Sequence, residues 1–315
     1  MTYVVLFAAL LTVHLFAGIA AAQSTVSTDI GARTWVTSGY TKWNFTAAGV
    51  NPLSELRWRG TDTVILEGQA DVVWRRLVLM SSIGGGRPHD GAFIDDDYFL
   101  DKYQARFSHT RSEVDGSHLF YGIGDVGYRV LQWHDPMSGT RGFFDAFVGY
   151  QYREEQYEAF GITGTFGLLP VLPVVPQALP TSTKVITHKY SFHSLRVGAR
   201  AVVPLGAGFA WRWNVAFLPY TRSELEDIHH LRDDFQKDPS GRSRADGGFG
   251  YQLDTALTYN VWRGLSVEAG YRFWGLDTGR GTDTTFFSDG TTSKSLLNEI
   301  IVERGGPYFG VQYRF

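Results

Sequence analysis

Two stretches of the chain concentrate acidic residues and histidines. Residues 95–97 are three consecutive aspartates, and Asp101 follows them; the run 227–234 contains three aspartates and two histidines. A histidine held by a carboxylate is a general base near neutral pH, and two facing carboxylates tend to share one proton. Such groups could together activate a water molecule, with no nucleophilic side chain required.

The spacing alone leaves other interpretations open. Acid-rich segments are often simply solvated, or they bind divalent cations through carboxylate oxygens. Three consecutive aspartates and an Asp-x-His pair are both weak patterns. The remaining histidines show no metal-ligand spacing, so we expect no metal site and interpret them as surface or lumen polar residues: His89, His109, His118, His134, His188 and His193.

The elements that must position these residues are indicated most clearly at the C-terminus. Apolar side chains occupy positions 309, 311, 313 and 315, with Gln312 and Arg314 between them. A period of two places the four apolar residues on one face of a strand. In a membrane barrel that face contacts lipid, and Gln312 and Arg314 point into a wet lumen.

Similar alternation recurs upstream and predicts an all-β fold, a transmembrane antiparallel β-barrel. We expect ten strands, with eight or twelve as the alternatives, at 29–46, 53–72, 76–87, 116–131, 142–160, 187–203, 209–224, 248–260, 265–281 and 300–315. Short connections alternate with long polar ones at 88–115, 161–186, 225–247 and 282–299. An even strand count sends the long connections to the cell exterior, so both acidic stretches are expected on outer loops.

Composition agrees with a barrel and excludes several classes of protein. The 29 Lys and Arg against 32 Asp and Glu lack the basic field that nucleic-acid binding needs, so we expect no nucleic-acid partner. Cysteine is absent, so no disulfide supports the fold. The late apolar run 166–179 contains three prolines, which forbid a continuous spanning helix. This run is interpreted as a stiff packing segment, with an apolar lid as the alternative.

Both chain ends resemble export signals. Residues 4–22 are almost wholly apolar and end in Ala20 and Ala22, which predicts a signal peptide at 1–22 and a barrel domain at 23–315. A retained membrane anchor is the alternative. The final Phe315 resembles the recognition signal of outer-membrane assembly, so the barrel-assembly machinery is an expected partner.

Four short segments resemble the omptin family, the ten-stranded outer-membrane aspartyl-type endoproteases. They follow the family's order along the mature chain: Ser-Gly-Tyr-Thr-Lys at 38–42, Leu-Ser-Glu-Leu-Arg-Trp at 53–58, Asp-Asp-Asp-Tyr at 95–98 and Asp-Ile-His at 227–229. Tyr98 stands where the family has tryptophan.

The resemblance implies roles for four residues. Asp95 and Asp97 would form the aspartate couple, and Asp227 and His229 the pair that activates water. It also implies a polypeptide substrate, a site facing the cell exterior, outer-membrane lipid and lipopolysaccharide as partners, and no cofactor other than a requirement for lipopolysaccharide. Arg153 and Lys189 are candidate contacts for its phosphates, if their side chains point outward.

The chain departs from the family at the substrate-binding positions. Omptins that cut next to basic residues carry acids where this chain has Trp43 and Leu225. A lysine or arginine side chain of a substrate, once buried in such a pocket, would lack the acids that pair with it. We therefore expect a cleavage preference that is not dibasic. Glu224 and Glu226 flank Leu225 and could supply replacement acids if the alignment slips by one residue.

The leading hypothesis is therefore an omptin-like endopeptidase at the outer mouth of a barrel. The alternative is a non-enzymatic barrel that binds a ligand or a host surface, like an adhesin. A small porin is the least favoured, because side chains largely fill the lumen of a ten-stranded barrel.

Overall fold

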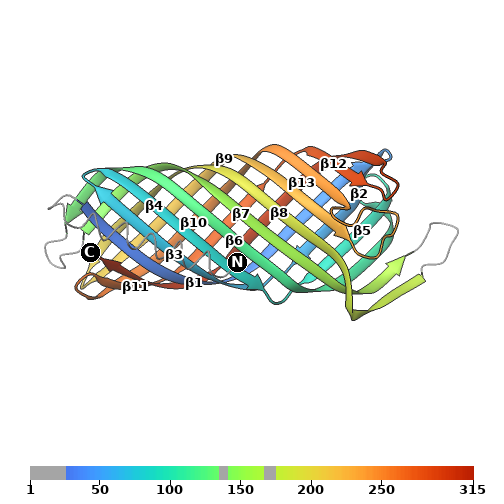
Figure 1. Ribbon diagram of the computed structural model, residues 1–315. Coiled ribbons are helices and arrows are strands. Elements are labelled where there is room, and N and C mark those ends of the chain that lie inside the picture. Colours follow the sequence, from blue (N-terminus) through green and yellow to red (C-terminus); the bar gives the residue numbers. More distant parts are fainter. Residues whose placement is uncertain (1–25, 135–140, 167–174) are drawn as a thin grey trace.

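The computed structural model describes residues 26–134, 141–166 and 175–315. The predicted signal peptide and the core of the proline-rich segment lie outside these residues. Within the described ranges, thirteen strands form a single sheet that closes into a barrel (Figure 1). No helix in these ranges is long and apolar enough to cross a membrane.

The strands follow one another around the barrel with antiparallel pairing. Their bounds are β1 (Val26–Ala47), β2 (Val50–Arg59), β3 (Thr63–Trp74), β4 (Leu77–Pro88), β5 (Ala92–Leu100), β6 (Gln104–His134), β7 (Arg141–Phe166), β8 (Val175–Gly206), β9 (Phe209–His229), β10 (Gly241–Trp262), β11 (Leu265–Asp277), β12 (Gly281–Phe286) and β13 (Thr292–Arg314).

The predicted count of ten strands is confirmed, because three positions in the ring are each occupied by two successive segments. β3 and β2 both pair with β1, β4 and β5 both pair with β6, and β11 and β12 both pair with β13. β13 also pairs with β1 and closes the ring of ten. The predicted strand 53–72 is interrupted at Gly60, whose φ of 60° breaks the extended backbone.

The prediction of long outer loops is wrong in large part. Most of 88–115, 161–186 and 282–299 is strand, and β6 and β8 span 31 and 32 residues. A membrane crossing takes only about 9–11 residues of a tilted strand, so the wall continues well beyond the bilayer. Outside lipid the outward face needs no apolar residues. The alternation signal therefore disappears while the hydrogen-bond ladder continues.

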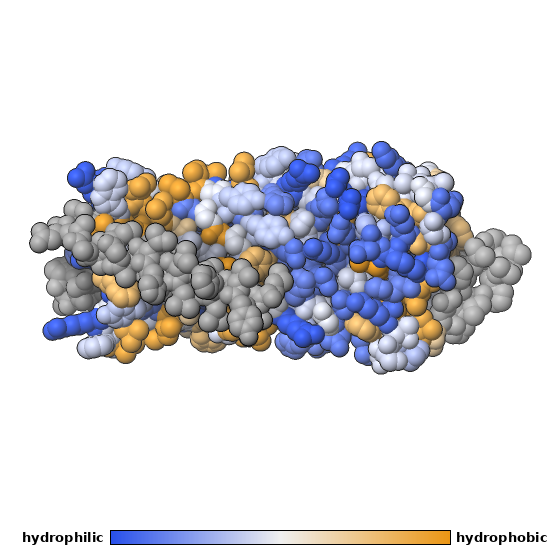
Figure 2. Space-filling model, in the orientation of Figure 1, coloured by the Kyte–Doolittle hydropathy of each residue, from blue (hydrophilic) through white to orange (hydrophobic). Residues whose placement is uncertain are grey.

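The half of the barrel that carries the C-terminus is apolar on its outer surface. Figure 2 shows this belt on the left, and it includes the exposed Phe309, Val311 and Tyr313 of the last strand. Between them, Gln312 accepts a hydrogen bond from Arg212, and Arg314 pairs with Asp29 at 2.6 Å. The predicted faces of this strand are confirmed, and the apolar belt is the part that contacts membrane lipid.

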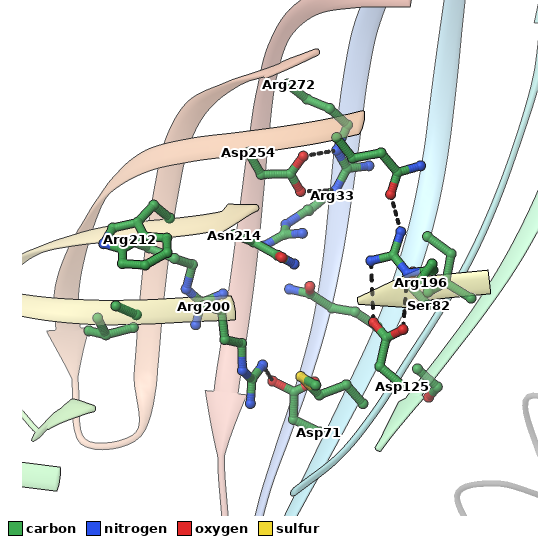
Figure 3. Close-up of a pocket in the computed structure, with 18 of the residues that line it drawn as sticks. Arg33, Asp71, Ser82, Asp125, Arg196, Arg200, Arg212, Asn214, Asp254 and Arg272 are labelled. Atoms are coloured by element: carbon green, nitrogen blue, oxygen red, sulfur yellow. Dashed lines mark hydrogen bonds and ion pairs between the residues drawn. The ribbon is translucent and has the colours of Figure 1, made fainter. Parts of the chain in front are cut away.

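Ion pairs fill the barrel interior at the level of this belt. Arg272 binds both Glu67 and Asp254 at 2.7 Å. Figure 3 shows the Arg272–Asp254 pair and the neighbouring pairs that join Arg196 to Asp125 and Arg200 to Asp71. The space left among these side chains is a cavity of about 80 Å³. That is room for a few water molecules, whereas a diffusion porin encloses a continuous water-filled channel.

The other half of the barrel has the opposite polarity. Its outer surface is hydrophilic, as the right side of Figure 2 shows. Its interior holds an apolar cluster, here called the upper core, that includes Trp43, Leu56, Trp58, Phe93, Tyr157, Ile186, Tyr190, Phe192, Leu225, Leu297 and Ile300. The acidic and histidine residues of interest lie at this end of the molecule.

Candidate active site

The three consecutive aspartates lie on β5 rather than on a loop. Because side chains alternate along a strand, Asp95 and Asp97 share the inner face and Asp96 points the other way. Asp96 is fully buried beneath Arg57, Arg106 and His109, with His109 Nδ1 at 2.6 Å from its Oδ1. Strand geometry thus separates Asp96 from the other two.

Asp97 and Asp95 have different neighbours. Asp97 is paired across the sheet with Ser54 on β2 and Ser108 on β6. Burial raises the pKa of Asp97, while hydrogen bonds from the two serines oppose that rise. Asp95 is paired instead with Leu56 and Thr110, and Ser54 donates a hydrogen bond to it at 3.4 Å.

Asp95 is the member of the couple that favours a proton. Its burial and the adjacent charge of Asp97 together raise its pKa well above the ordinary value. Because the two carboxyl groups interact, they titrate as a pair. The couple therefore retains a proton more readily than an isolated aspartate, and Asp95 is its preferred carrier.

Asp227 and His229 form an ion pair at the end of β9. His229 Nε2 lies 2.9 Å from Asp227 Oδ2. Burial disfavours the charge on Asp227, but His229 and His188 outweigh it and hold the Asp227 pKa well below its usual value. Burial likewise lowers the His229 pKa, but the charge of Asp227 outweighs it and the net shift is upward.

The pairing leaves one ring nitrogen of His229 for chemistry. In the neutral ring, Nε2 carries the proton that is donated to Asp227, so Nδ1 carries the lone pair. The His229 side chain keeps 28% of its surface exposed, whereas Asp227 is buried. His229 Nδ1 is therefore the basic atom that can receive a proton from water.

The two pairs come from opposite parts of the barrel wall. β5 and β9 are separated in the sheet by β6, β7 and β8. Even so, the charge of Asp227 raises the pKa of Asp95, and His229 lowers that of Asp97. The two pairs therefore lie within electrostatic range of each other across the barrel interior.

His188 adjoins this site, and the sequence analysis missed it. It lies on β8 directly opposite Asp227, is fully buried, and brings its Nε2 to 3.3 Å from Asp227 Oδ1. A signal was present, because Ile186, His188, Tyr190 and Phe192 alternate with polar residues as a buried face. A histidine within such an apolar row needs a specific partner.

Asp283 on β12 is a second residue that the sequence analysis missed. Ser243 and Ser295 each donate a hydrogen bond to it, at 2.6 and 2.9 Å. Burial raises its pKa against those hydrogen bonds, and the charge of Asp227 adds to the rise. Within the described part of the chain, no three acidic or histidine side chains are arranged to hold a metal ion.

Trp43 and Leu225 both belong to the upper core. Trp43 meets the ring of His188 edge-on with centroids 5.7 Å apart. Leu225 is fully buried and precedes Asp227 by two residues on the same inner face. The two positions therefore place buried apolar side chains, and no charge, beside the site.

Glu224 and Glu226 lie on the outer face of β9, away from Asp227. Glu224 pairs with Arg244 at 2.6 Å, and Glu226 pairs with Arg242 at 2.7 Å. They are not positioned to replace acids beside Leu225, because alternation turns them outward.

Arg153 also differs from the expectation, because its side chain is buried against Glu155 and does not point outward. Lys189 is partly exposed, with Glu154 at 3.8 Å. Of the two proposed contacts for lipopolysaccharide phosphates, only Lys189 is accessible from outside.

Comparison with known proteins adds a result for the fold. No family model and no curated protein matches the sequence. The crystal structure of the outer-membrane protease OmpT from Escherichia coli matches with a TM-score of 0.77 and 14% identity, over 93% of this chain and 98% of that one. The fold is that of a bacterial outer-membrane β-barrel.

Other barrels match far less closely. A major outer-membrane protein from Thermus thermophilus has a TM-score of 0.32 and 12% identity, over 93% of this chain and 100% of that one. A FadL homologue from Pseudomonas aeruginosa has a TM-score of 0.30 and 8% identity, over 92% and 90%.

Proposed function

We propose that this protein is an omptin-like outer-membrane endopeptidase. Its water would be activated between the Asp227–His229 pair and the Asp95–Asp97 couple. The observation that carries the proposal is the Asp227–His229 pair at 2.9 Å, which faces the inner side of the barrel together with Asp95 and Asp97 and influences the pKa of both. The resemblance in sequence and the match to a protease of the same fold support it.

The proposed reaction is a direct hydrolysis. His229 Nδ1 takes a proton from water as the water oxygen bonds to the peptide carbonyl carbon. Asp227 stabilises the imidazolium that forms. The carbon–nitrogen bond then breaks, and the leaving nitrogen takes the proton held by Asp95. The proton on His229 returns to the carboxylate couple or to solvent, which restores the starting state.

The proposed site faces the cell exterior. The site lies at the end of the barrel opposite the C-terminus, beyond the apolar belt (Figures 1 and 2). With the chain ends in the periplasm, that end is outside the cell. A requirement for lipopolysaccharide is part of the proposal, since the hydrophilic wall stands where its headgroups would be.

The proposed cleavage preference is not dibasic. Trp43 and Leu225 are buried apolar side chains beside the site, and Glu224 and Glu226 are held outside by arginines. A lysine or arginine side chain of a substrate would be desolvated there without a paired carboxylate, which is unfavourable.

The experiment is digestion of a peptide library by the refolded barrel, with and without lipopolysaccharide, read by mass spectrometry. Asp97→Ala and His229→Ala should each abolish cleavage. His230→Ala is a matched control because His230 contacts Thr187 instead of Asp227. Asp101 directly follows β5, so the variant Asp101→Asn is the control for the aspartate couple, and it should cleave peptides like wild type.

A correctly folded barrel that cleaves no peptide across lipids and pH would contradict the proposal. That result would favour the alternative of a non-enzymatic barrel that binds a ligand or a surface. Cleavage that survives both Asp97→Ala and His229→Ala would also reject this site.

A further inference from the structure

His188 is held in a fixed orientation by the strands and rings around it. The register of β8 against β9 sets it directly opposite Asp227 on the inner face. Four aromatic rings meet the imidazole edge-on, with centroid separations between 5.4 and 5.9 Å: Trp43, Trp58, Phe93 and Tyr190. The imidazole therefore cannot turn without repacking the upper core.

The contact with Trp58 decides which nitrogen of the neutral His188 ring carries the proton. Trp58 Nε1 lies 3.0 Å from His188 Nδ1, and an indole nitrogen can only donate. His188 Nδ1 must therefore accept, so the neutral ring carries its proton on Nε2. Nε2 is the atom that faces Asp227 Oδ1 at 3.3 Å.

His188 Nε2 and Asp227 Oδ1 have no other partner among the described residues. Both atoms are buried, they lie 3.3 Å apart, and neither makes a hydrogen bond of standard geometry with any described residue. A buried donor and a buried acceptor that face each other at this distance stabilise one another, because neither can turn to water. The other Asp227 oxygen, Oδ2, is used by His229.

We propose that His188 is a positioning residue for Asp227 in the reaction. With its Nε2 3.3 Å from Oδ1, it limits rotation of the carboxylate, keeps Oδ2 on His229 and thus keeps His229 Nδ1 directed at the water. The terminal torsion of an aspartate is otherwise broad, so a single partner would leave it loosely held. This role rests on the proposed endopeptidase function.

The kinetic test compares two substitutions. In His188→Gln the amide can accept from Trp58 and donate toward Asp227, whereas His188→Phe keeps an aromatic ring and removes the polar contacts with Trp58, Tyr190 and Asp227. We expect His188→Phe to lower kcat by about 10- to 100-fold with little change in KM, the size of effect that misplacement of a catalytic group produces. His188→Gln should recover most of that loss. His89→Gln, an exposed histidine on the same side of the barrel, is the control and should act like wild type.

A second measurement does not depend on cleavage. Nitrogen-15 NMR of histidine-labelled protein in micelles should show the Nε2-protonated tautomer of His188. The same spectra follow the titration of His229, whose charged surroundings are Asp227, Asp97, Arg232, Asp234 and His230. The His229 pKa should change in His188→Phe and return toward the wild-type value in His188→Gln.

The outcomes separate the two proposals. An Nδ1-protonated His188, or equal losses of kcat in folded His188→Phe and His188→Gln, would overturn the positioning role. If wild type cleaves no peptide while the tautomer and the His229 titration behave as expected, the endopeptidase is rejected and the contact that holds Asp227 still stands.

Discussion

The two aspartates of the couple differ because of what lies beside each on the neighbouring strands. Asp97 is flanked by Ser54 and Ser108, whose hydroxyl groups can donate to a charged carboxylate. Asp95 is flanked by Leu56, which offers no hydrogen bond, and by Thr110, and Ser54 donates to it across a long 3.4 Å. Two identical side chains two residues apart thereby acquire different roles, with Asp95 favouring the proton and Asp97 the charge.

Replacing Asp95 should stabilise the protein while removing its activity. Its raised pKa means that ionisation costs more in the folded state than in the unfolded state, so its contribution to stability falls as pH rises above the unfolded pKa. Asp95→Asn removes that penalty at neutral pH. We expect a higher melting temperature by circular dichroism and no peptide cleavage. A lower melting temperature of Asp95→Asn at pH 7 would contradict a raised pKa for Asp95.

The pH dependence of cleavage should follow His229. Its pKa is raised above 6.5 and the base must be neutral, so kcat/KM should rise with pH through a value above 6.5. The ion pair with Asp227 stabilises the fold below the unfolded pKa of His229, and this contribution is lost as pH rises through the folded pKa. Asp227→Asn removes the charge that raises the pKa, so NMR should find His229 titrating at lower pH. If His229 titrates at the same pH in Asp227→Asn, Asp227 is not what raises the His229 pKa.

At the scale of the element, strand β9 reverses its polarity along its length. On β9, Val215 and Phe217 are exposed on the outer face within the apolar belt, whereas further along Leu225 is buried inside. The polarity reverses because lipid contacts the outside of the lower half of the barrel, whereas water contacts the outside of the upper half. The upper half is thus stabilised like a soluble barrel, through its interior.

Leu225→Ala should therefore weaken the upper half of the barrel selectively. Truncating a fully buried leucine leaves a cavity and costs about 2–5 kcal/mol. Hydrogen exchange should show lost protection at the ends of β9 and β10 near the site, with the membrane half unchanged. Val215→Ala, on the lipid face of the same strand, is the control. Loss of protection spread equally along the strands would refute a separate upper core.

At the scale of the whole molecule, the pairing of β1 with β13 closes the ring, so the described strands have no free edge at the level of the membrane. Inside that ring, ion pairs occupy the lower half and the upper core occupies the upper half. The described interior thus holds side chains rather than a channel, and the barrel serves as a rigid support for residues at its outer end.

The predicted signal for assembly can be tested separately from stability. Phe315 is 72% exposed, and its ring contacts Tyr313. Deleting it removes little buried surface, so refolding into detergent micelles should be unchanged. The amount of barrel in the outer membrane of cells should fall, as judged by heat-modifiable migration of membrane fractions. Trp262→Ala, equally exposed at the same end of the barrel, is the control. Normal assembly of the deletion would contradict the prediction.

Short-range patterns were enough for several features of this protein. The period of two predicted the lipid-facing and lumen-facing sides of the last strand, and repeated alternation with turn signals predicted ten strands. The same period explains why Asp95 and Asp97 share a face, and why Asp227 and His229 do. Each is a property of residues two apart on one strand, which is information that a single sequence contains.

Tertiary structure decided the features that depend on distant strands. Register set His188 opposite Asp227, closure brought β5 and β9 within electrostatic range, and the aqueous surroundings of the upper half kept polar segments in strands where loops were expected. Register and closure are sums over many hydrogen-bonded pairs around the ring. No local pattern in the sequence contains them, because each depends on which residues of other strands come to lie alongside.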